Sequence, residues 1–121
     1  MKVERFEDMI AWKKARGLTS SIYKLTGEPP LNKDFGLIDQ IRRASGSIMH
    51  NIAEGFDAGS NAEFIRFLRY SYRSASEVQS QLYIMSDVHD LDDKTFKELY
   101  EAATEIKKVI SGLIGYLLKK K

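Results

Sequence analysis

The sequence predicts an all-α protein, an antiparallel up-down-up-down four-helix bundle. Turn-forming residues gather in only three places, at 27–34, 55–61 and 89–93, and they divide the 121 residues into four segments. Each segment places apolar residues three or four positions apart, which is the period of an amphipathic helix and not of a strand. Four such helices with short connections bury their apolar stripes by packing as a bundle.

The first two segments carry one apolar stripe each. The first stripe is the less regular, ends near Thr26 and Gly27, and consists of Met9, Trp12, Ala15, Leu18, Ile22 and Leu25. The second alternates spacings of three and four through Ile38, Ile41, Ser45, Ile48, Ile52 and Gly55. A close approach of the second and third helices is predicted by the small residues Ser45, Gly46, Ser71 and Ala75.

The third and fourth segments also carry signals for their first residues. Ser60 and Glu63 form a capping-box pattern before a stripe of Phe64, Leu68, Ser71, Ala75, Val78, Leu82, Met85 and His89. Asp92 is placed to cap the fourth helix, whose stripe is Phe96, Leu99, Ala103, Ile106, Ile110, Leu113 and Leu117. The lysines at 119–121 meet the negative end of the dipole of that helix.

Length and composition fit a single domain, residues 1–121. A hydrophobic share of 43% is enough to bury a core, and a net charge of +2 does not by itself indicate a nucleic-acid-binding protein. The absence of Cys excludes disulfides, thiolate metal sites and a Cys nucleophile. The charged N-terminus lacks the apolar core of a signal peptide, and the apolar run 109–118 has about half the roughly 20 residues of a membrane span. We expect a cytoplasmic protein without a membrane partner.

The sequence offers little for catalysis. It has two His, no Glu-x-x-His pair for a di-iron site and no glycine-rich phosphate loop, so we expect no metal, no cofactor and no catalytic residue. One alternative is the pair Arg43 and His50 on the outward side of the second helix, which resembles the Arg-x4-6-His motif of HEPN-type ribonucleases. There, His50 would activate a ribose hydroxyl while Arg43 holds the phosphate. A surface His beside a surface Arg is the commoner explanation of the same pattern.

Arginines of the third helix predict a nucleic-acid-binding surface. Arg66, Arg69 and Arg73 fall opposite the apolar stripe, with Tyr70 and Tyr72 interleaved. Guanidinium groups bind phosphates and tyrosine rings stack on bases. With the basic residues of the first two helices, the candidate binding residues are Lys13, Lys14, Arg42, Arg43, Arg66, Arg69 and Arg73.

Carboxylates provide a structural explanation for the same arginines. Arg73 lies one turn before Glu77, and Arg42 and Arg43 could reach Glu77 across the bundle instead of binding phosphate. The acidic residues gather near the last turn and in the fourth helix, as Asp87, Asp90, Asp92, Asp93, Glu98, Glu101 and Glu105. We therefore expect one basic and one acidic side.

Apolar residues outside the stripes predict self-association. They include Val109 and the candidate interface residues Tyr83, Ile84, Ile114, Tyr116 and Leu118. A four-helix bundle has one interior, so this surplus favours a homo-oligomer, and a wide core face is the alternative.

Four stretches, at 6–15, 35–45, 51–55 and 63–68, resemble a known family. They read FEDMIAWKKA, FGLIDQIRRAS, NIAEG and EFIRFL. They are similar to the four-helix-bundle proteins encoded in intervening sequences of bacterial 23S rRNA genes, which are similar in turn to the accessory variability determinant protein of diversity-generating retroelements. The resemblance implies a homo-oligomer, expected as a ring-shaped pentamer, and for the retroelement relatives a basic surface that binds nucleic acid and a reverse transcriptase.

Two residues depart from the family pattern, and two others suggest a structural role. Met49 stands where the family often has Pro, which predicts an unkinked second helix, and Arg73 stands where it often has Gly. We expect Asn51 and Glu54 to tie the turn at Gly55 to a neighbouring helix by hydrogen bonds.

Together these observations favour a non-enzymatic, oligomeric bundle that binds RNA or DNA without sequence specificity. A reverse transcriptase or another protein is the further partner that the resemblance implies. The alternative is a protein-interaction scaffold whose arginines serve only solubility and subunit pairing.

Overall fold

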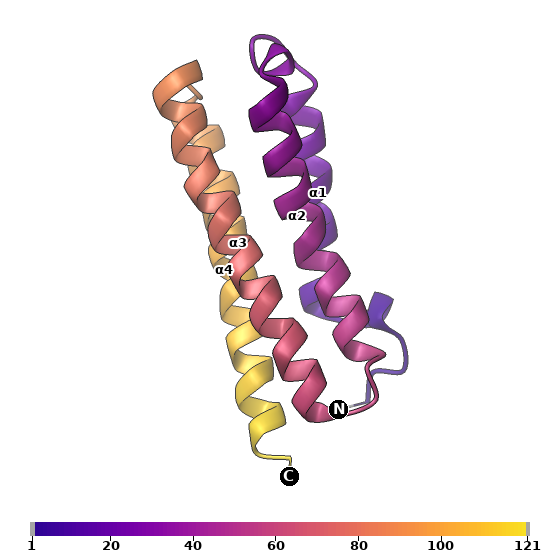
Figure 1. The fold of residues 1–121 in the computed structure, drawn as a ribbon. Helices are drawn as coiled ribbons and strands as arrows, with labels where there is room; N and C mark the ends of the chain where they lie inside the picture. The colour runs from indigo at the N-terminus through magenta and orange to yellow at the C-terminus, as the bar shows by residue number, and fades with distance from the viewer. Residues whose placement is uncertain (1, 121) are drawn as a thin grey trace.

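The protein is a bundle of four antiparallel helices in a computed structural model that describes residues 2–120 (Figure 1). The helices are α1 (Ile10–Thr26), α2 (Phe35–Phe56), α3 (Asn61–His89) and α4 (Asp93–Leu118), with short 3-10 turns η1 (Phe6–Asp8) and η2 (Leu31–Lys33). No strand occurs among these residues. The predicted all-α four-helix bundle is confirmed, and α2 is continuous through Met49.

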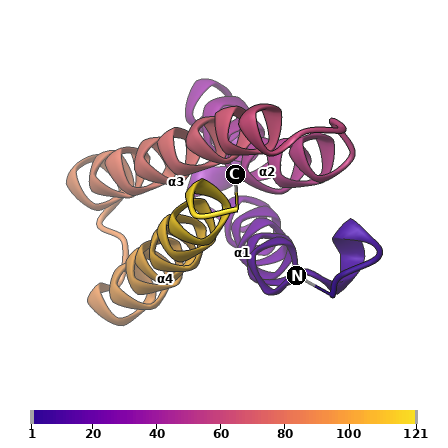
Figure 2. The ribbon, with the colours of Figure 1, turned by 90° about the horizontal axis from the view of Figure 1, so that it is seen from below.

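The helices form two neighbouring pairs. Figure 2 shows α2 between α1 and α3, and α4 between the same two helices on the other side, so that α1 and α3 lie diagonally across the bundle. The α2–α3 turn, the start of α1 and the end of α4 lie at one end of the bundle, and the α1–α2 and α3–α4 connections lie at the other (Figure 1).

Side chains cap three of the four helices at their N-termini. Ser60 Oγ accepts a hydrogen bond from Glu63 N at 3.2 Å, and Asp92 Oδ2 accepts one from Thr95 N at 3.1 Å, so both predicted caps are confirmed. Asp34 caps α2 in the same way, although the sequence placed it only in a turn. These bonds satisfy backbone donors that the first helical turn leaves unpaired.

The predicted stripes largely coincide with the core. On α3 every predicted residue is buried except His89, which is half-buried. On α2 the buried side takes in Leu37 and Ala44, and Ile38 is half-buried. On α1, Ala11 and Thr26 are buried, whereas Trp12 and Leu25 are half-buried.

Ile114 was predicted at a subunit interface, and the structure shows that this was wrong. Its exposed fraction is 8%, so it belongs to the core of the monomer. The physical reason is its spacing: Ile114 follows Ile110 by four residues and precedes Leu117 by three, which keeps all three on the buried side of α4. Leu113, which the sequence placed in the stripe, is half-buried.

The close approach of α2 and α3 is confirmed. Ser45, Ser71 and Ala75 are fully buried, and Ser71 Oγ donates a hydrogen bond to the carbonyl oxygen of Ile48 at 2.8 Å. Gly46 lies away from this contact, beside the ring of His50.

The α2–α3 contact continues to the end of α2. A Cβ atom at Gly55 would lie 2.7 Å from Phe67 Cβ, so only glycine fits there. Within residues 2–120, Asn51 does not bond to another helix directly. It donates to Ser47 O and Oγ at 2.9 Å, and Ser47 Oγ accepts from Ser74 of α3.

Candidate nucleic-acid interface

The predicted arginines of α3 lie on its exposed side. Arg66 makes a two-pronged ion pair with Glu63, at 2.9 and 3.1 Å, and donates to Tyr70 Oη at 2.9 Å. The Tyr70 ring lies between the guanidinium groups of Arg66 and Arg73, which are 5.5 and 5.7 Å from its centroid. The hydrogen bonds to Glu63 and Tyr70 raise the pKa of Arg66, so it remains charged but is partly neutralised.

Arg69 and Arg73 keep free guanidinium groups. Neither makes a hydrogen bond or an ion pair with any residue in 2–120, and the alternative pairing of Arg73 with Glu77 is not formed there. Glu77 instead accepts a hydrogen bond from Gln81 Nε2 at 3.2 Å. Two guanidinium groups on this side are therefore available to a phosphate.

A lysine of α4 is held over a tyrosine of α3. Lys107 Nζ lies 4.9 Å from the centroid of the Tyr72 ring and donates to Gln79 Oε1 at 3.1 Å. The amide nitrogen of Gln79 donates to Thr104 Oγ1 at 2.8 Å and to the carbonyl of Tyr100 at 3.2 Å. A shallow hollow of about 370 Å³ is lined by Tyr72, Thr104, Lys107, Lys108 and Ser111.

Sequence reasoning missed Lys107 and Lys108 because it assigned the last segment to the acidic side. Their signal was the spacing of Thr104, Lys107, Lys108 and Ser111, which places them on one stripe beside the core stripe of the same helix. We use the name α3–α4 basic face for the surface made by Arg66, Arg69, Arg73, Lys107 and Lys108.

The α3–α4 basic face and the carboxylates of the α3–α4 turn lie at opposite ends of the bundle. The α3–α4 basic face lies in the first half of α3 and the second half of α4, where Asn61 Nδ2 donates to the carbonyl of Lys120 at 3.1 Å. The carboxylates of the α3–α4 turn, Asp87, Asp90, Asp92 and Asp93, lie at the opposite end (Figure 1). The expected division into one basic and one acidic side is not seen, because α4 carries Glu101 and Glu105 as well as Lys107 and Lys108.

The structure does not bring the lysines of α1 to this face. α1 lies diagonally across the bundle from α3 and reaches only the opposite side of α4 (Figure 2). Lys14 Nζ is 2.8 Å from Glu105 Oε1, and this pairing lowers the pKa of Glu105. Lys13 is exposed on the same helix.

Arg42 serves the packing of α1 against α2. Its Nε donates to Thr26 Oγ1 at 2.9 Å, its Nη2 donates to the carbonyl of Tyr23 at 3.3 Å, and its guanidinium lies 4.4 Å from the Tyr23 ring centroid. Arg43 is 80% exposed and pairs with Asp39, one turn earlier on α2, at 3.1 Å. Neither arginine pairs with Glu77 in the part of the chain that the structure describes.

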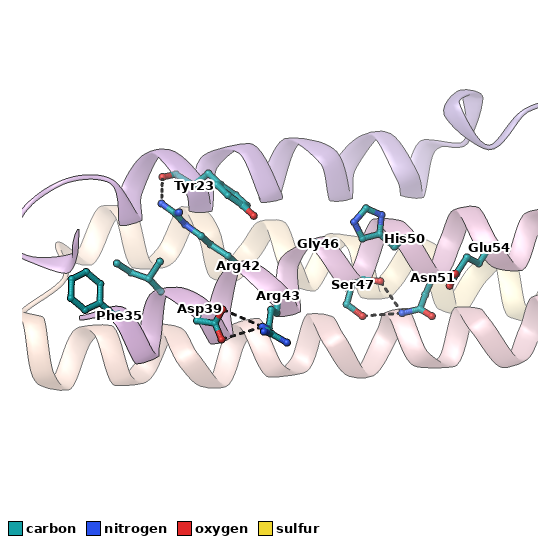
Figure 3. A pocket seen from close by; sticks show the side chains of 11 residues that line it. Tyr23, Phe35, Asp39, Arg42, Arg43, Gly46, Ser47, His50, Asn51 and Glu54 are labelled. Carbon is teal, nitrogen blue, oxygen red and sulfur yellow. Dashed lines mark hydrogen bonds and ion pairs between the residues drawn. The ribbon is translucent and has the colours of Figure 1, made fainter. Parts of the chain in front are cut away.

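The outward side of α2 holds a larger hollow, of about 720 Å³ (Figure 3). Arg43 and His50 both line it, with Gly46 and Ser47 between them. Arg43 is held by Asp39, whereas the exposed ring of His50 has no hydrogen-bond partner among residues 2–120. No described residue therefore orients the His50 ring as a general base requires.

The remaining interface candidates are exposed but separate. Tyr83 faces α4, where its ring packs against Phe96 and Tyr100, and 52% of the residue stays exposed. Ile84 and Val88 lie one turn apart on α3, with 44% and 64% exposed. Further exposed candidates on α4 are Tyr116 and Leu118.

Residues 2–120 contain neither a cluster of metal ligands nor a membrane-spanning helix. No group of three or more His, Asp or Glu side chains is placed to hold a metal ion. No helix among these residues combines the length and apolar character that crossing a bilayer requires.

Comparison with known proteins places the chain in a family. The family described as 23S rRNA-intervening sequence protein matches residues 7–112. The crystal structure of a protein of unknown function from the S23 ribosomal protein family of Bacteroides thetaiotaomicron is similar, with 26% sequence identity and a TM-score of 0.79 over 87% of this chain and 98% of that one. Among curated proteins no relative matches. The match over most of its length shows that the chain belongs to the 23S rRNA-intervening sequence protein family.

Proposed function

We propose that this protein is a non-enzymatic, oligomeric bundle of the cytoplasm that binds RNA or DNA without sequence specificity through the α3–α4 basic face. The observation that supports the proposal is the set of five basic side chains on two adjacent helices, four of which lie beside Tyr70 or Tyr72. Such side chains bind phosphates, which position a polyanion but carry no sequence information.

The proposed face leaves out several of the seven basic residues that the sequence predicted to bind nucleic acid. Arg42 is excluded because its guanidinium joins α1 to α2. Lys14 is excluded because it is paired with Glu105, and Lys13 because it is exposed on a helix that does not neighbour α3. Ribonuclease activity is not part of the proposal, since Arg43 is bound to Asp39 and no described residue orients His50.

The test is binding of a structured RNA and of a DNA duplex across a salt series, followed by fluorescence anisotropy. Replacing Arg66, Arg69 and Arg73 together by Ala should weaken binding and lower the slope of log affinity against log salt by about 2 to 3, at roughly 0.7–0.9 per phosphate contact.

The matched control removes the same charge from the opposite end of the bundle, by replacing Lys24, Lys33 and Lys94 with Ala. That variant should keep the slope of the unchanged protein. Equal losses in both variants would assign the effect to net charge and contradict the proposed face. Absence of binding even at low salt would favour a protein-interaction scaffold instead.

Self-association and a protein partner belong to the same proposal. The resemblance implies a pentamer, and Ile84 and Val88 offer an exposed apolar pair on α3 for subunit contacts. A reverse transcriptase is the partner that follows from the resemblance to the accessory variability determinant protein. Sedimentation of the unchanged protein and of a variant with Ile84→Asp and Val88→Asp tests the interface, because two buried carboxylates should dissociate it into monomers.

A further inference from the structure

Three aromatic rings form a cluster between α3 and α4, beyond the α3–α4 basic face. The Tyr83 ring lies 5.1 Å from Phe96 and 5.8 Å from Tyr100, and the last two are stacked at 5.6 Å. The Tyr100 hydroxyl raises the pKa of Tyr83. The cluster therefore holds the half-exposed Tyr83 ring in a fixed orientation.

Buried polar contacts connect this cluster to Tyr72. Gln79 is only 6% exposed, bonds to the backbone of Tyr100 and holds Lys107 beside the Tyr72 ring. Tyr72 and Tyr83 are eleven residues apart, close to three full turns, so both lie on the side of α3 that faces α4. Their separation along the helix is about 16 Å at 1.5 Å per residue.

This surface has one exposed ring at Tyr72 and another at Tyr83, with basic side chains beside Tyr72. The arrangement suits a single strand of nucleic acid. In a duplex the bases are paired and stacked on each other, whereas an unpaired base can stack on a tyrosine. At about 3.4 Å per phosphate of a stacked strand, the distance between the two rings spans about five nucleotides. Lys107 and Lys108 lie beside Tyr72, where the phosphates of such a strand would run.

We infer that the α3–α4 basic face binds single-stranded nucleic acid, with unpaired bases stacked on Tyr72 and Tyr83 and phosphates beside Lys107 and Lys108. This inference rests on the proposed function, to which it adds the class of ligand.

The experiment compares four fluorescent probes at one low salt concentration. They are an oligouridylate, an oligothymidylate, an abasic strand of the same length and a DNA duplex. The strands that carry bases should bind about tenfold or more tightly than the abasic strand, because each of the two stacked bases contributes about fivefold or more. Comparing the RNA and DNA strands shows which sugar the face prefers.

Substitutions locate the stacking. Tyr72→Ala should lose about tenfold for the strands with bases and little for the abasic strand, while Tyr72→Phe should retain affinity because it keeps the ring. Tyr83→Phe likewise keeps the aromatic cluster and should retain affinity. Lys107→Met removes a charge but keeps an aliphatic side chain over the Tyr72 ring. Phe35→Ala is the matched control, since it removes an aromatic ring that is 77% exposed on α2.

The outcomes separate this inference from the proposed function. Equal affinity for base-bearing and abasic strands, with the salt dependence intact, would overturn the inference and leave nucleic-acid binding standing. Tighter binding of the duplex than of any single strand would also overturn it. Absence of binding to all four probes would overturn both.

Discussion

The imidazole of His89 and the carboxylate of Asp34 lie 2.7 Å apart, Nε2 to Oδ2, and join the last residue of α3 to the residue that caps α2. Asp34 also accepts a hydrogen bond from the backbone of Leu37. Both bonds favour the ionised carboxylate, so the pKa of Asp34 lies below its ordinary value, and the bond to His89 is the larger cause. The Asp34 carboxylate thus caps the N-terminus of α2 and also links α2 to α3.

The first prediction concerns the stability of the protein at acidic pH. Because the pKa of Asp34 is lowered by folding, its contribution to stability is complete above the ordinary aspartate value of about 4 and is lost as the pH falls through the lowered pKa. Thermal unfolding from pH 7 to pH 3 should show this loss, and His89→Ala should reduce both the stability at pH 7 and the part lost in acid. His50→Ala, which removes an exposed imidazole, should leave the profile unchanged.

The sequence alone predicted which side of α3 is buried but not this pair. Periodicity placed His89 at the end of the stripe, because a helix repeats its buried side every three or four residues. It cannot say which residue of another segment lies opposite, and Asp34 had been placed only in a turn. The misplacement of Ile114 has a different origin: the stripe was continued through Leu113, whereas the neighbouring Ile114 is the residue on the buried side of α4.

The second prediction concerns the two glycines 17 and 55. Gly55→Ala should lower the free energy of unfolding by about 1–3 kcal/mol, because its Cβ would lie 2.7 Å from Phe67 Cβ and force α2 and α3 apart. Gly17→Ala should raise it by about 0.5–1 kcal/mol, since no described side chain comes within 4 Å and alanine favours a helix. Urea unfolding of both variants measures the difference. A neutral Gly55→Ala would contradict the close contact.

The third prediction separates two neighbouring arginines. Arg42→Ala should cost about 1–2 kcal/mol of stability, because the guanidinium bonds to Thr26 and Tyr23 hold α1 against α2. Arg43→Ala should change stability by less than about 0.5 kcal/mol, since its pair with Asp39 is exposed to solvent. Thermal unfolding tests both, and equal effects would refute the assigned roles. Neither variant should alter the salt slope of nucleic-acid binding.

The candidate site was predictable in part for the same physical reason as the core. Opposite the buried stripe of α3, Arg66, Arg69 and Arg73 are exposed as predicted. The sequence could not show that Arg42 is used internally, because that depends on Thr26 and Tyr23 of another helix. Contacts between helices decide which charged side chains remain available to bind a phosphate, and these contacts cannot be predicted from composition.

The last prediction concerns Asp90, which follows α3 with a φ of 56°. This left-handed conformation strains most side chains, and a carboxylate here also faces the negative end of the dipole of α3. Asp90→Asn should raise the free energy of unfolding by about 0.3–1 kcal/mol, because it removes the charge and keeps a residue that tolerates this conformation. Asp90→Gly should stabilise at least as much, since glycine also relieves the strain.

Thermal unfolding at low and high salt separates the two causes. Salt should screen the electrostatic gain of Asp90→Asn, whereas the gain of Asp90→Gly that comes from relieved strain should persist. A lower unfolding temperature in both variants would mean that the carboxylate stabilises the α3–α4 turn by a contact that outweighs both costs.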